Sequence, residues 1–408
     1  MNKIRIVYNG WGERWTLGSL AANGASPMFE YSHEALARKL ELSPFRMPLR
    51  EQAHTRGETF FEGLPGFVAD ALPDGWGRML MDRAFRRAGR EPAMVTALER
   101  LAFIDDRAMG ALTFEPAENH EFGAHDVVLL DLANRIDRLT TATSVAVLNE
   151  LVLIGGSPQG ARPKALVHYD RVAARMTSGG GAQGEPWLIK FPSRGEHAEA
   201  CAIEEIYARL ARACGIEMTE SAYFPLNRRL AAFGARRFDR EGGMRVPVLT
   251  LAGALHSDYR VPAIDAIDFL RLTKLMTNDM REVHAAFERC VFNLVFNNRD
   301  DHAKNFSYRL GHDGRWRLSP AYDLTFNRGP RGHHQMAYAG ETLAPAFANV
   351  LGVAQKGEVS DAKARQIIKR MLSIAGKLAK RAVALPIRKA TLRAIVDAVG
   401  ANCARLKG

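Results

Sequence analysis

The sequence predicts an α+β fold in three parts, and three observations support it. Short strand patterns with glycine turns open the chain, a strand-rich stretch begins at about residue 155, and helical periodicity dominates from residue 265 onward. We therefore expect a small N-terminal α/β subdomain over 1–115, a β-rich lobe over 116–250 and a mostly helical lobe over 251–408. A cleft between two such lobes is a usual place for a ligand.

Composition and charge narrow the class of protein. The chain has 408 residues, 47% hydrophobic and 25% charged, which is a globular balance that excludes a disordered chain. Its formal charge of +11 favours anionic partners, although dispersed basic residues mostly indicate solvated helix faces. We find no apolar leader and no run of about 18 apolar residues, so we expect a cytoplasmic protein with no membrane partner. The four cysteines lack metal-binding spacing and are expected to be small buried side chains.

The N-terminal part begins with a predicted hairpin. Strands are expected at Ile4–Tyr8 and Trp15–Ser19, with Gly10 and Gly12 in the turn between them. The other elements expected before the boundary at Pro116 are a strand at Phe29–Tyr31, helices at Phe60–Leu72 and Arg78–Leu101, and a strand at Gly110–Phe114.

The strands and helices after Pro116 are predicted from the same hydrophobic periodicity. The expected strands are Ala165–Tyr169, Trp187–Phe191, Glu220–Pro225, Leu230–Phe238 and Arg245–Thr250. The expected helices are Val127–Arg138, Ser144–Ile154, Glu196–Cys214, Ala266–Met276, Met280–Asn298, Asp361–Ala384 and Lys389–Ala404. Helices thus predominate in the C-terminal part.

The strongest chemical signal is the segment Asn298–Phe306. Within it, Asp300 and Asn305 have four residues between them. Phosphoryl transfer needs a carboxylate that accepts or orients the hydroxyl proton, and an oxygen ligand for Mg²⁺ nearby. Protein kinases use an Asp and an Asn at this spacing for those two tasks. An isolated match is common, because both residue types also belong in turns.

A predicted hairpin strengthens this signal. Strands at Phe306–Arg309 and Trp316–Ser319 lead to Asp323, where kinase-like folds place a second metal-binding Asp. Oxygen ligands at both ends of one hairpin suit Mg²⁺. We expect His302 to orient the loop through hydrogen bonds, since such a histidine is more often a loop anchor than a metal ligand.

Residues that bind phosphate groups are expected earlier in the chain than this segment. Lys190 lies on an apolar strand, where a lysine is costly unless it meets a phosphate or carboxylate; the alternative is a strand-end lysine that reaches water. Glu204 or Glu205 on the following helix is its expected partner, and adjacent glutamates face different sides, so at most one faces the cleft. The glycine-rich segment Gly155–Lys164 could cradle phosphates with main-chain N–H groups, although alone it is a weak signal.

Together these segments resemble the HipA family of kinase toxins. The resemblance runs over nearly the whole chain and rests on five segments. These segments are the catalytic stretch Asn298–Ser307, the metal-Asp segment Leu318–Asp323, the adenine-side hinge Arg237–Arg240, and the segments Leu251–His256 and Leu72–Gly77. The resemblance implies a two-lobed, protein-kinase-like core with an additional N-terminal subdomain.

The resemblance also implies roles for single residues. Asp300 would be the catalytic base, Asn305 and Asp323 would bind Mg²⁺, and Lys190 would contact an ATP phosphate. Lys190 and the loop-orienting His302 are counted with Asp300 among the predicted catalytic residues. Glu204 would pair with Lys190. The residues implied to contact ATP are Gly160, Ala161, Lys164, Lys190, Arg237, Phe238, Asp300, Asn305 and Asp323.

A serine in the glycine-rich loop is implied to be a site of self-modification. The family has a Ser-x-x-Gly-x-x-x-Lys loop whose serine is autophosphorylated, which inactivates the kinase, and Ser157–Lys164 fits that spacing. A phosphate there would compete with ATP phosphates for the same donors. The alternative is an ordinary turn serine. Two departures from the family pattern are Asp301, where some members have Gly, and the prolines Pro158 and Pro163 within the loop.

The function implied is that of a serine/threonine-protein kinase toxin from a type II toxin–antitoxin system, of the kind linked to persistence. Its implied cofactors are ATP and Mg²⁺. Its implied partners are a HipB-like helix-turn-helix antitoxin, DNA through the antitoxin complex, and a protein substrate, for which an aminoacyl-tRNA synthetase is a candidate. Two alternatives stay open: a DNA-binding corepressor component with little kinase activity, and a kinase of a small molecule or lipid head group.

Overall fold

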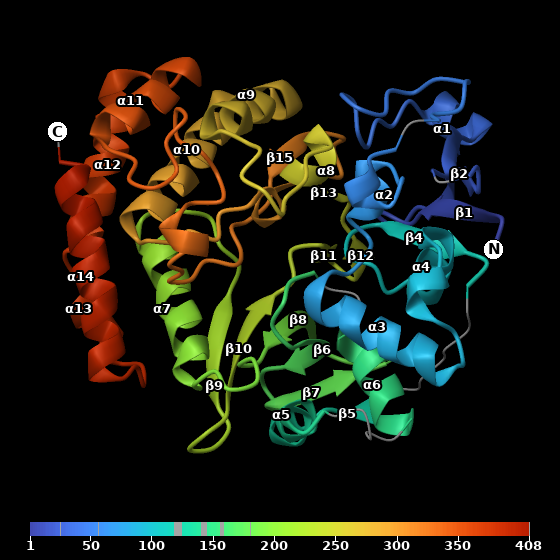
Figure 1. Cartoon of the computed structure of the whole chain (residues 1–408), viewed down its shortest axis with the longest axis horizontal. Helices are drawn as coiled ribbons and strands as arrows, with labels where there is room; N and C mark the ends of the chain where they lie inside the picture. The colour runs from blue at the N-terminus through green and yellow to red at the C-terminus, as the bar shows by residue number, and fades with distance from the viewer. Residues whose placement is uncertain are drawn as a thin grey trace. The chain divides into compact units, whose positions relative to one another are not determined.

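The computed structural model describes residues 1–24, 26–55, 57–117, 125–139, 145–155, 159–179 and 181–407 (Figure 1). The chain forms two compact units. The N-terminal unit contains Met1–Ala198, Ala222–Leu249 and Gly253–His256, and the C-terminal unit contains Glu199–Ser221, Thr250–Ala252 and Ser257–Gly408. The division into 1–115, 116–250 and 251–408 stays a prediction.

The N-terminal unit begins with a four-stranded antiparallel sheet in the order β3-β2-β1-β4. Its strands are β1 (Lys3–Tyr8), β2 (Trp15–Ala21), β3 (Met28–Tyr31) and β4 (Leu112–Glu115). Ile4 and Ile6 of β1 are fully buried, while Lys3 before them and Arg5 between them are exposed. This alternation is the period-2 pattern that predicted the strand, and the hairpin of β1 and β2 is confirmed.

Short helices cover this part of the unit. They are α1 (His33–Arg38), η1 (Thr59–Phe61), α2 (Gly66–Ala69), α3 (Gly75–Arg87), η2 (Pro92–Met94) and α4 (Ala97–Ile104). The predicted continuous helices Phe60–Leu72 and Arg78–Leu101 are therefore wrong in their extent. After α3 the chain adopts a positive φ at Gly89, and Pro92 lacks the N–H that a continuing helix needs, so two helices replace one.

A six-stranded sheet forms the rest of the N-terminal unit, in the order β5-β7-β6-β8-β10-β9. Its strands are β5 (His125–Asp126), β6 (Lys164–Asp170), β7 (Arg175–Ser178), β8 (Glu185–Lys190), β9 (Ser221–Pro225) and β10 (Ala231–Arg236). Trp187 of β8 packs edge-to-face against Tyr169 and Phe224, which gives the sheet an aromatic core.

The sheet is joined by helices α5 (Leu129–Asp137) and α6 (Val145–Gly155), with α6 packed on α3 and β6. A separate two-stranded ribbon consists of β11 (Arg240–Glu241) and β12 (Met244–Arg245). The strand β13 (Val248–Thr250) and the helix α8 (Leu251–Leu255) contain residues of both units.

Helices dominate the C-terminal unit, as predicted. They are α7 (Glu199–Ala213), α9 (Ala266–Thr277), α10 (Met280–Val295), α11 (Phe347–Lys356), α12 (Asp361–Ala375), α13 (Leu378–Ala382) and α14 (Lys389–Arg405). The long α10 packs against α9, α12 and α14, and the Tyr207 hydroxyl donates to the Phe296 main-chain oxygen at 2.6 Å. The predicted helix Asp361–Ala384 is two helices, because the chain turns at Gly376.

This unit also carries two short 3₁₀ turns, η3 (Ala303–Asn305) and η4 (Pro330–Gly332), and a hairpin of β14 (Ser307–Leu310) and β15 (Trp316–Leu318). Cys201, Cys214 and Cys290 are buried and Cys403 is half-buried, which agrees with the expected packing role. Among the described residues, no helix is both long enough and apolar enough to cross a membrane.

Candidate functional site

The loop after α10 holds the predicted base and the predicted metal-binding amide together. Asn305 donates a hydrogen bond from Nδ2 to the main-chain oxygen of Asp300 at 2.7 Å, which closes the loop on itself. Because the amide nitrogen is used in this way, the amide oxygen is the atom that Asn305 can offer to a cation. The Asp300 side chain is 39% exposed, so its carboxylate is accessible to a substrate hydroxyl.

His302 lies between these two residues and contacts the loop on both sides. Its Nδ1 accepts a hydrogen bond from the main-chain N–H of Lys304 at 3.2 Å, which caps η3. Its Nε2 lies 3.9 Å from the Asp300 Oδ1, and its ring packs against that of Tyr259. These contacts are those of a loop anchor, and the orienting role assigned to His302 stays a prediction.

The hairpin brings the segment of Asp323 to the same loop. At the open end of the hairpin, away from its turn, the buried Ser307 and Ser319 hydroxyls share a hydrogen bond of 2.8 Å. The Tyr322 hydroxyl then donates to the Lys304 main-chain oxygen at 2.6 Å. Asp323 follows with φ 56°, a left-handed conformation that is uncommon for a residue with a side chain. The predicted ligands Asn305 and Asp323 therefore lie on two segments that are hydrogen-bonded to each other.

Sequence reasoning missed the main role of Asp301. Its carboxylate is fully buried and accepts four hydrogen bonds. The donors are the main-chain N–H groups of Gln335 and Met336, at 2.8 and 3.3 Å, Nδ1 of His334 at 2.8 Å and the hydroxyl of Tyr338 at 2.7 Å. Burial and the Asp301 charge raise the pKa of Tyr338 well above its usual value. Asp301 thus ties the loop of Asp300 to the segment 334–338.

On the N-terminal unit, two lysines predicted to contact ATP lie side by side. Lys164 and Lys190 are directly opposed across the antiparallel pair β6–β8, and both are buried. The Lys164 Nζ donates to the Gln159 main-chain oxygen, and the Lys190 Nζ lies 6.0 Å from the ring centre of Phe233. Two cations at opposed positions concentrate positive charge, which attracts phosphate.

The glycine-rich loop precedes Lys164. Gly160 and Ala161 are described, and Gly160 adopts φ 105°, a conformation that favours glycine. Its N–H donates to the carboxylate of Asp74, on the N-terminal part of the chain. Ser157, the predicted site of autophosphorylation, and Pro158 lie outside the described residues.

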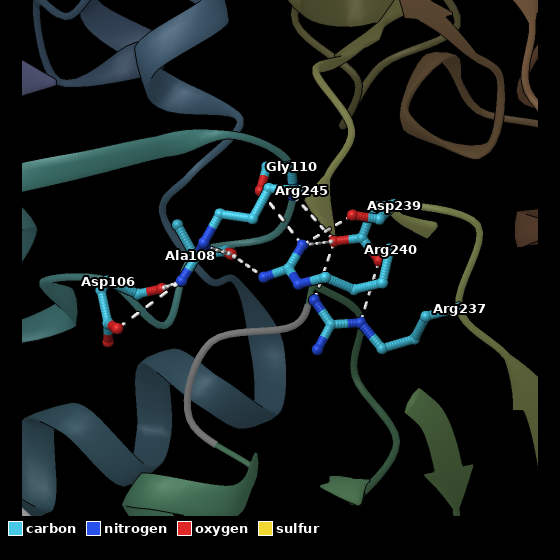
Figure 2. A network of polar contacts seen from close by, with 7 residues as sticks. All are labelled: Asp106, Ala108, Gly110, Arg237, Asp239, Arg240 and Arg245. Atoms are coloured by element: carbon cyan, nitrogen blue, oxygen red, sulfur yellow. Dashed lines mark hydrogen bonds and ion pairs between the residues drawn. The ribbon is translucent and has the colours of Figure 1, made fainter. Parts of the chain in front are cut away.

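The predicted adenine hinge contains a buried ion cluster, which Figure 2 shows. The Asp239 carboxylate accepts hydrogen bonds from Arg237 Nε at 2.9 Å and from Arg240 Nη1 at 2.7 Å. It also accepts from the main-chain N–H of Gly110 at 2.8 Å. Burial alone would raise the pKa of Asp239, but the charges of Arg237 and Arg240 outweigh it and hold this pKa well below its usual range.

This cluster changes what Arg237 can contribute to a nucleotide site. Its guanidinium is used by Asp239, and its main-chain N–H donates to the Pro186 oxygen at 2.9 Å. Neither group is therefore the one that would hold adenine. The predicted contact with adenine would therefore involve the other main-chain groups of Arg237 and Phe238, and it stays a prediction.

Glu204, the predicted partner of Lys190, is buried on α7 and belongs to the C-terminal unit, whereas Lys190 belongs to the N-terminal unit. Its neighbour Glu205 is engaged within its own unit, since it accepts from Arg209 Nε and from the Ser221 hydroxyl, each at 2.6 Å. Of the two adjacent glutamates, Glu204 stays the predicted partner.

In the part of the chain that the structure describes, no group of three or more His, Cys, Asp or Glu side chains could hold a metal ion. The predicted pair Asn305 and Asp323 is a smaller set of one amide and one carboxylate oxygen. Such a set fits Mg²⁺, which usually takes one or two protein oxygens and completes its shell with waters and substrate phosphates.

Comparison with protein families identifies the class. Residues 9–115 match the HipA N-terminal domain, and residues 156–379 match the HipA-like C-terminal domain. The second match alone covers more than half of the chain, so this chain belongs to the HipA family. The predicted resemblance is therefore confirmed.

Comparison with solved structures gives two examples of similar chains. One is a complex of the Shewanella oneidensis MR-1 toxin–antitoxin system HipA, HipB and its operator DNA, with a TM-score of 0.74 and 17% identity over 98% of this chain and 96% of the other. Another is the Helicobacter pylori proinflammatory kinase CtkA, with a TM-score of 0.39 and 11% identity over 60% of this chain and 89% of the other. Comparison with curated proteins gives no significant sequence match. The α+β, HipA-like fold class is confirmed by the first of these structures.

Proposed function

We propose that this chain is an ATP- and Mg²⁺-dependent serine/threonine-protein kinase and the toxin of a HipA-type toxin–antitoxin module. One observation carries the proposal: Asp300, whose carboxylate is accessible, and Asn305 are held in one loop by the 2.7 Å hydrogen bond from the Asn305 side-chain amide to the Asp300 main-chain oxygen. That pairing of a base with a metal-binding amide suits phosphoryl transfer.

In the proposed reaction, the substrate hydroxyl oxygen attacks the γ-phosphorus of ATP. The new P–O bond forms as the bond to the bridging oxygen breaks, ADP leaves, and the hydroxyl proton passes to the carboxylate of Asp300. Asn305 and Asp323 would hold Mg²⁺, which supplies charge neutralisation to the phosphates when bound. Lys164 and Lys190, which are buried on neighbouring strands, would bind phosphate oxygens.

The proposed partners follow from the family and from its structural relative. We propose that the protein acts in the cytoplasm, binds a HipB-like helix-turn-helix antitoxin and reaches operator DNA through it, as the composition of the Shewanella complex suggests. The proposed substrate is a protein, with an aminoacyl-tRNA synthetase as the candidate, and Ser157 is the proposed site of autophosphorylation.

A second candidate function is that of a corepressor component with little kinase activity. It is favoured by the same relative, whose solved form includes operator DNA. The two functions are compatible in one protein. A kinase of small molecules or lipid head groups is the remaining alternative, for which no described contact provides specific support.

The test is incubation of purified protein with Mg-ATP, followed by mass spectrometry of phosphorylated peptides, beside Asp300→Asn. Phosphate on Ser157 that depends on Asp300 supports both the kinase and the self-modification. ATP binding without phosphorylation of the wild type, either of itself or of a candidate synthetase, favours the corepressor function. Absence of ATP binding, in protein shown to be unphosphorylated at the start, refutes the kinase.

A further inference from the structure

The N-terminal end of α3 contacts the glycine-rich loop through several main-chain groups. The main-chain N–H of Trp76 donates to the Gly160 oxygen at 3.1 Å. The N–H of Gly160 donates in return to the carboxylate of Asp74. One residue before, the Gln159 side-chain amide donates to the main-chain oxygen of Asp70 at 2.8 Å. The loop and the helix end are thus hydrogen-bonded in both directions.

Asp74 holds an unusual position for a helix-capping residue. It is the N-cap of α3, yet its side chain makes no capping hydrogen bond to the first turn of that helix. An N-cap aspartate ordinarily accepts from the N–H groups of its own first turn, which stabilises the helix. Here that carboxylate accepts from Gly160, and the Gly160 oxygen receives the N–H of Trp76 instead. The cap of α3 is therefore completed by the loop.

Gly75 allows this close approach. A Cβ atom at this position would lie 2.7 Å from the Ala161 Cα and 2.7 Å from the Gly160 oxygen. The residue also adopts φ +41°, which L side chains rarely adopt. Any side chain here would push Gly160 and Ala161 away from α3. The segment Leu72–Gly77, which predicted only family membership, is thus the surface on which the loop lies.

The loop conformation bears on a residue of the proposed phosphate site. Lys164 follows Gly160 by four residues, and its Nζ donates to the main-chain oxygen of Gln159. A Cβ added at Gly160 would lie 2.3 Å from the same Nζ, so the lysine head group passes directly over the glycine. The path of the main chain at 159–161 therefore sets the position of the Lys164 ammonium group.

We propose that Asp74 and Gly75 are positioning residues for ATP binding: the N-terminal subdomain holds the glycine-rich loop, and through it Lys164, in the conformation that receives the phosphates. This inference rests on the proposed kinase function and assigns a catalytic task to a subdomain that has no catalytic motif of its own. Neither residue is proposed to contact ATP. Their replacement is therefore expected to raise KM for ATP more than it lowers kcat.

The sharpest test replaces Gly75, the first residue of α3, and Gly89, which follows the other end of that helix. Gly75→Ala introduces both backbone strain and a collision with the loop, whereas Gly89→Ala, after the other end of the helix, introduces comparable strain at φ +72° and meets nothing within 4 Å. We expect Gly75→Ala to raise KM for ATP about tenfold with kcat within about threefold of wild type, and Gly89→Ala to leave KM unchanged. Equal effects of the two variants would attribute the result to strain and overturn the proposal.

Substitutions of Asp74 test the hydrogen bond itself. Asp74→Ala is expected to raise KM for ATP by a similar factor and to speed amide hydrogen exchange at 159–164, while Asp74→Asn, whose side-chain oxygen still accepts, largely restores both. An unchanged KM in Asp74→Ala would overturn the proposal, because the contact would then have no effect on ATP binding. A lower KM would also overturn it, because Asp74 would then compete with ATP for the Gly160 N–H. If the wild type neither binds ATP nor transfers phosphate, the proposed kinase function fails. Amide exchange, which needs no catalysis, would then still decide whether Asp74 holds the loop.

Discussion

Asn305 donates a hydrogen bond to the main-chain oxygen of Asp300 at 2.7 Å, so the side-chain nitrogen fixes the loop and the side-chain oxygen is left for the proposed Mg²⁺. The observed and the proposed task use different atoms of the same amide, because Nδ2 donates the hydrogen bond while Oδ1 is the proposed ligand atom. They can therefore be separated by substitution.

We expect Asn305→Asp to keep an oxygen ligand but to lose the hydrogen bond to Asp300, and Asn305→Ala to lose both. Single-turnover phosphorylation should fall at least about tenfold in the first variant and about 100-fold or more in the second. Asn349→Ala is the control, because that amide accepts from the main chain of Ala346 within α11. Equal rates for the two Asn305 variants would show that the hydrogen bond, and not the ligand, is the important contribution.

Replacing Asp301 should destabilise the fold. Asp301→Gly leaves the side chains of His334 and Tyr338 and two main-chain N–H groups without their buried acceptor. Each such group costs about 1–3 kcal/mol, so the free energy of unfolding in urea should fall by about 3 kcal/mol or more. Asp301→Asn, which keeps one acceptor oxygen, should lose less. A loss below about 1 kcal/mol for the glycine variant would contradict this account.

The Asp239 cluster predicts a pH-dependent contribution to stability. The folded-state pKa of Asp239 is lowered, so its contribution is present above the unfolded-state pKa of about 4 and is lost as pH falls toward the folded-state value. Asp239→Asn should lower the free energy of unfolding by about 3–5 kcal/mol at pH 7, because it leaves Arg237 and Arg240 as buried charges. The difference from wild type should shrink below pH 4.

A matched control for this prediction is Asp313→Asn. Asp313 forms an exposed pair with Arg317 four residues away, and that contact lowers the pKa of Asp313 to about 2. Exposed pairs of this kind contribute little to stability, so this variant should unfold almost as wild type does. A loss as large as that of Asp239→Asn would show that burial is not the cause.

His256 predicts a loss of stability in mild acid. Burial, with smaller contributions from Arg46 and His54, lowers the pKa of His256 to about 4, and its Nε2 accepts from the Gly66 N–H at 3.1 Å. Only the neutral ring can accept, so its contribution is complete above pH 6.5 and is lost as pH falls toward 4.

The measurement is chemical denaturation at pH 7 and pH 4.5 for wild type and His256→Gln, whose side-chain oxygen accepts without titrating. We expect the wild type to lose about 2 kcal/mol more than the variant over this range, somewhat less than the full shift gives because the ring is partly accessible. Identical pH profiles would exclude His256 as the titrating group.

Much of the candidate site could be predicted from the sequence because its spacing is local. Asp300 and Asn305 share one loop, and the hairpin that leads to Asp323 is visible in the alternation of apolar residues around a glycine turn. Lys190 could be predicted as an unusual cation on an apolar strand. Its opposition to Lys164 could not, because the register of β6 and β8 is set by the whole sheet.

The sequence by itself thus determined the α+β class, the family and the local motifs, since periodicity and turn residues act over a few positions. Only the tertiary structure decided which distant groups form hydrogen bonds with the residues of these motifs. The Asp301 carboxylate accepts a hydrogen bond from Tyr338, that of Asp239 from the Gly110 N–H, and that of Asp74 from the Gly160 N–H. These donors lie 37, 129 and 86 positions away in the chain. These contacts leave no local pattern, because a buried carboxylate needs donors of the right geometry and any segment that the fold brings near can supply them.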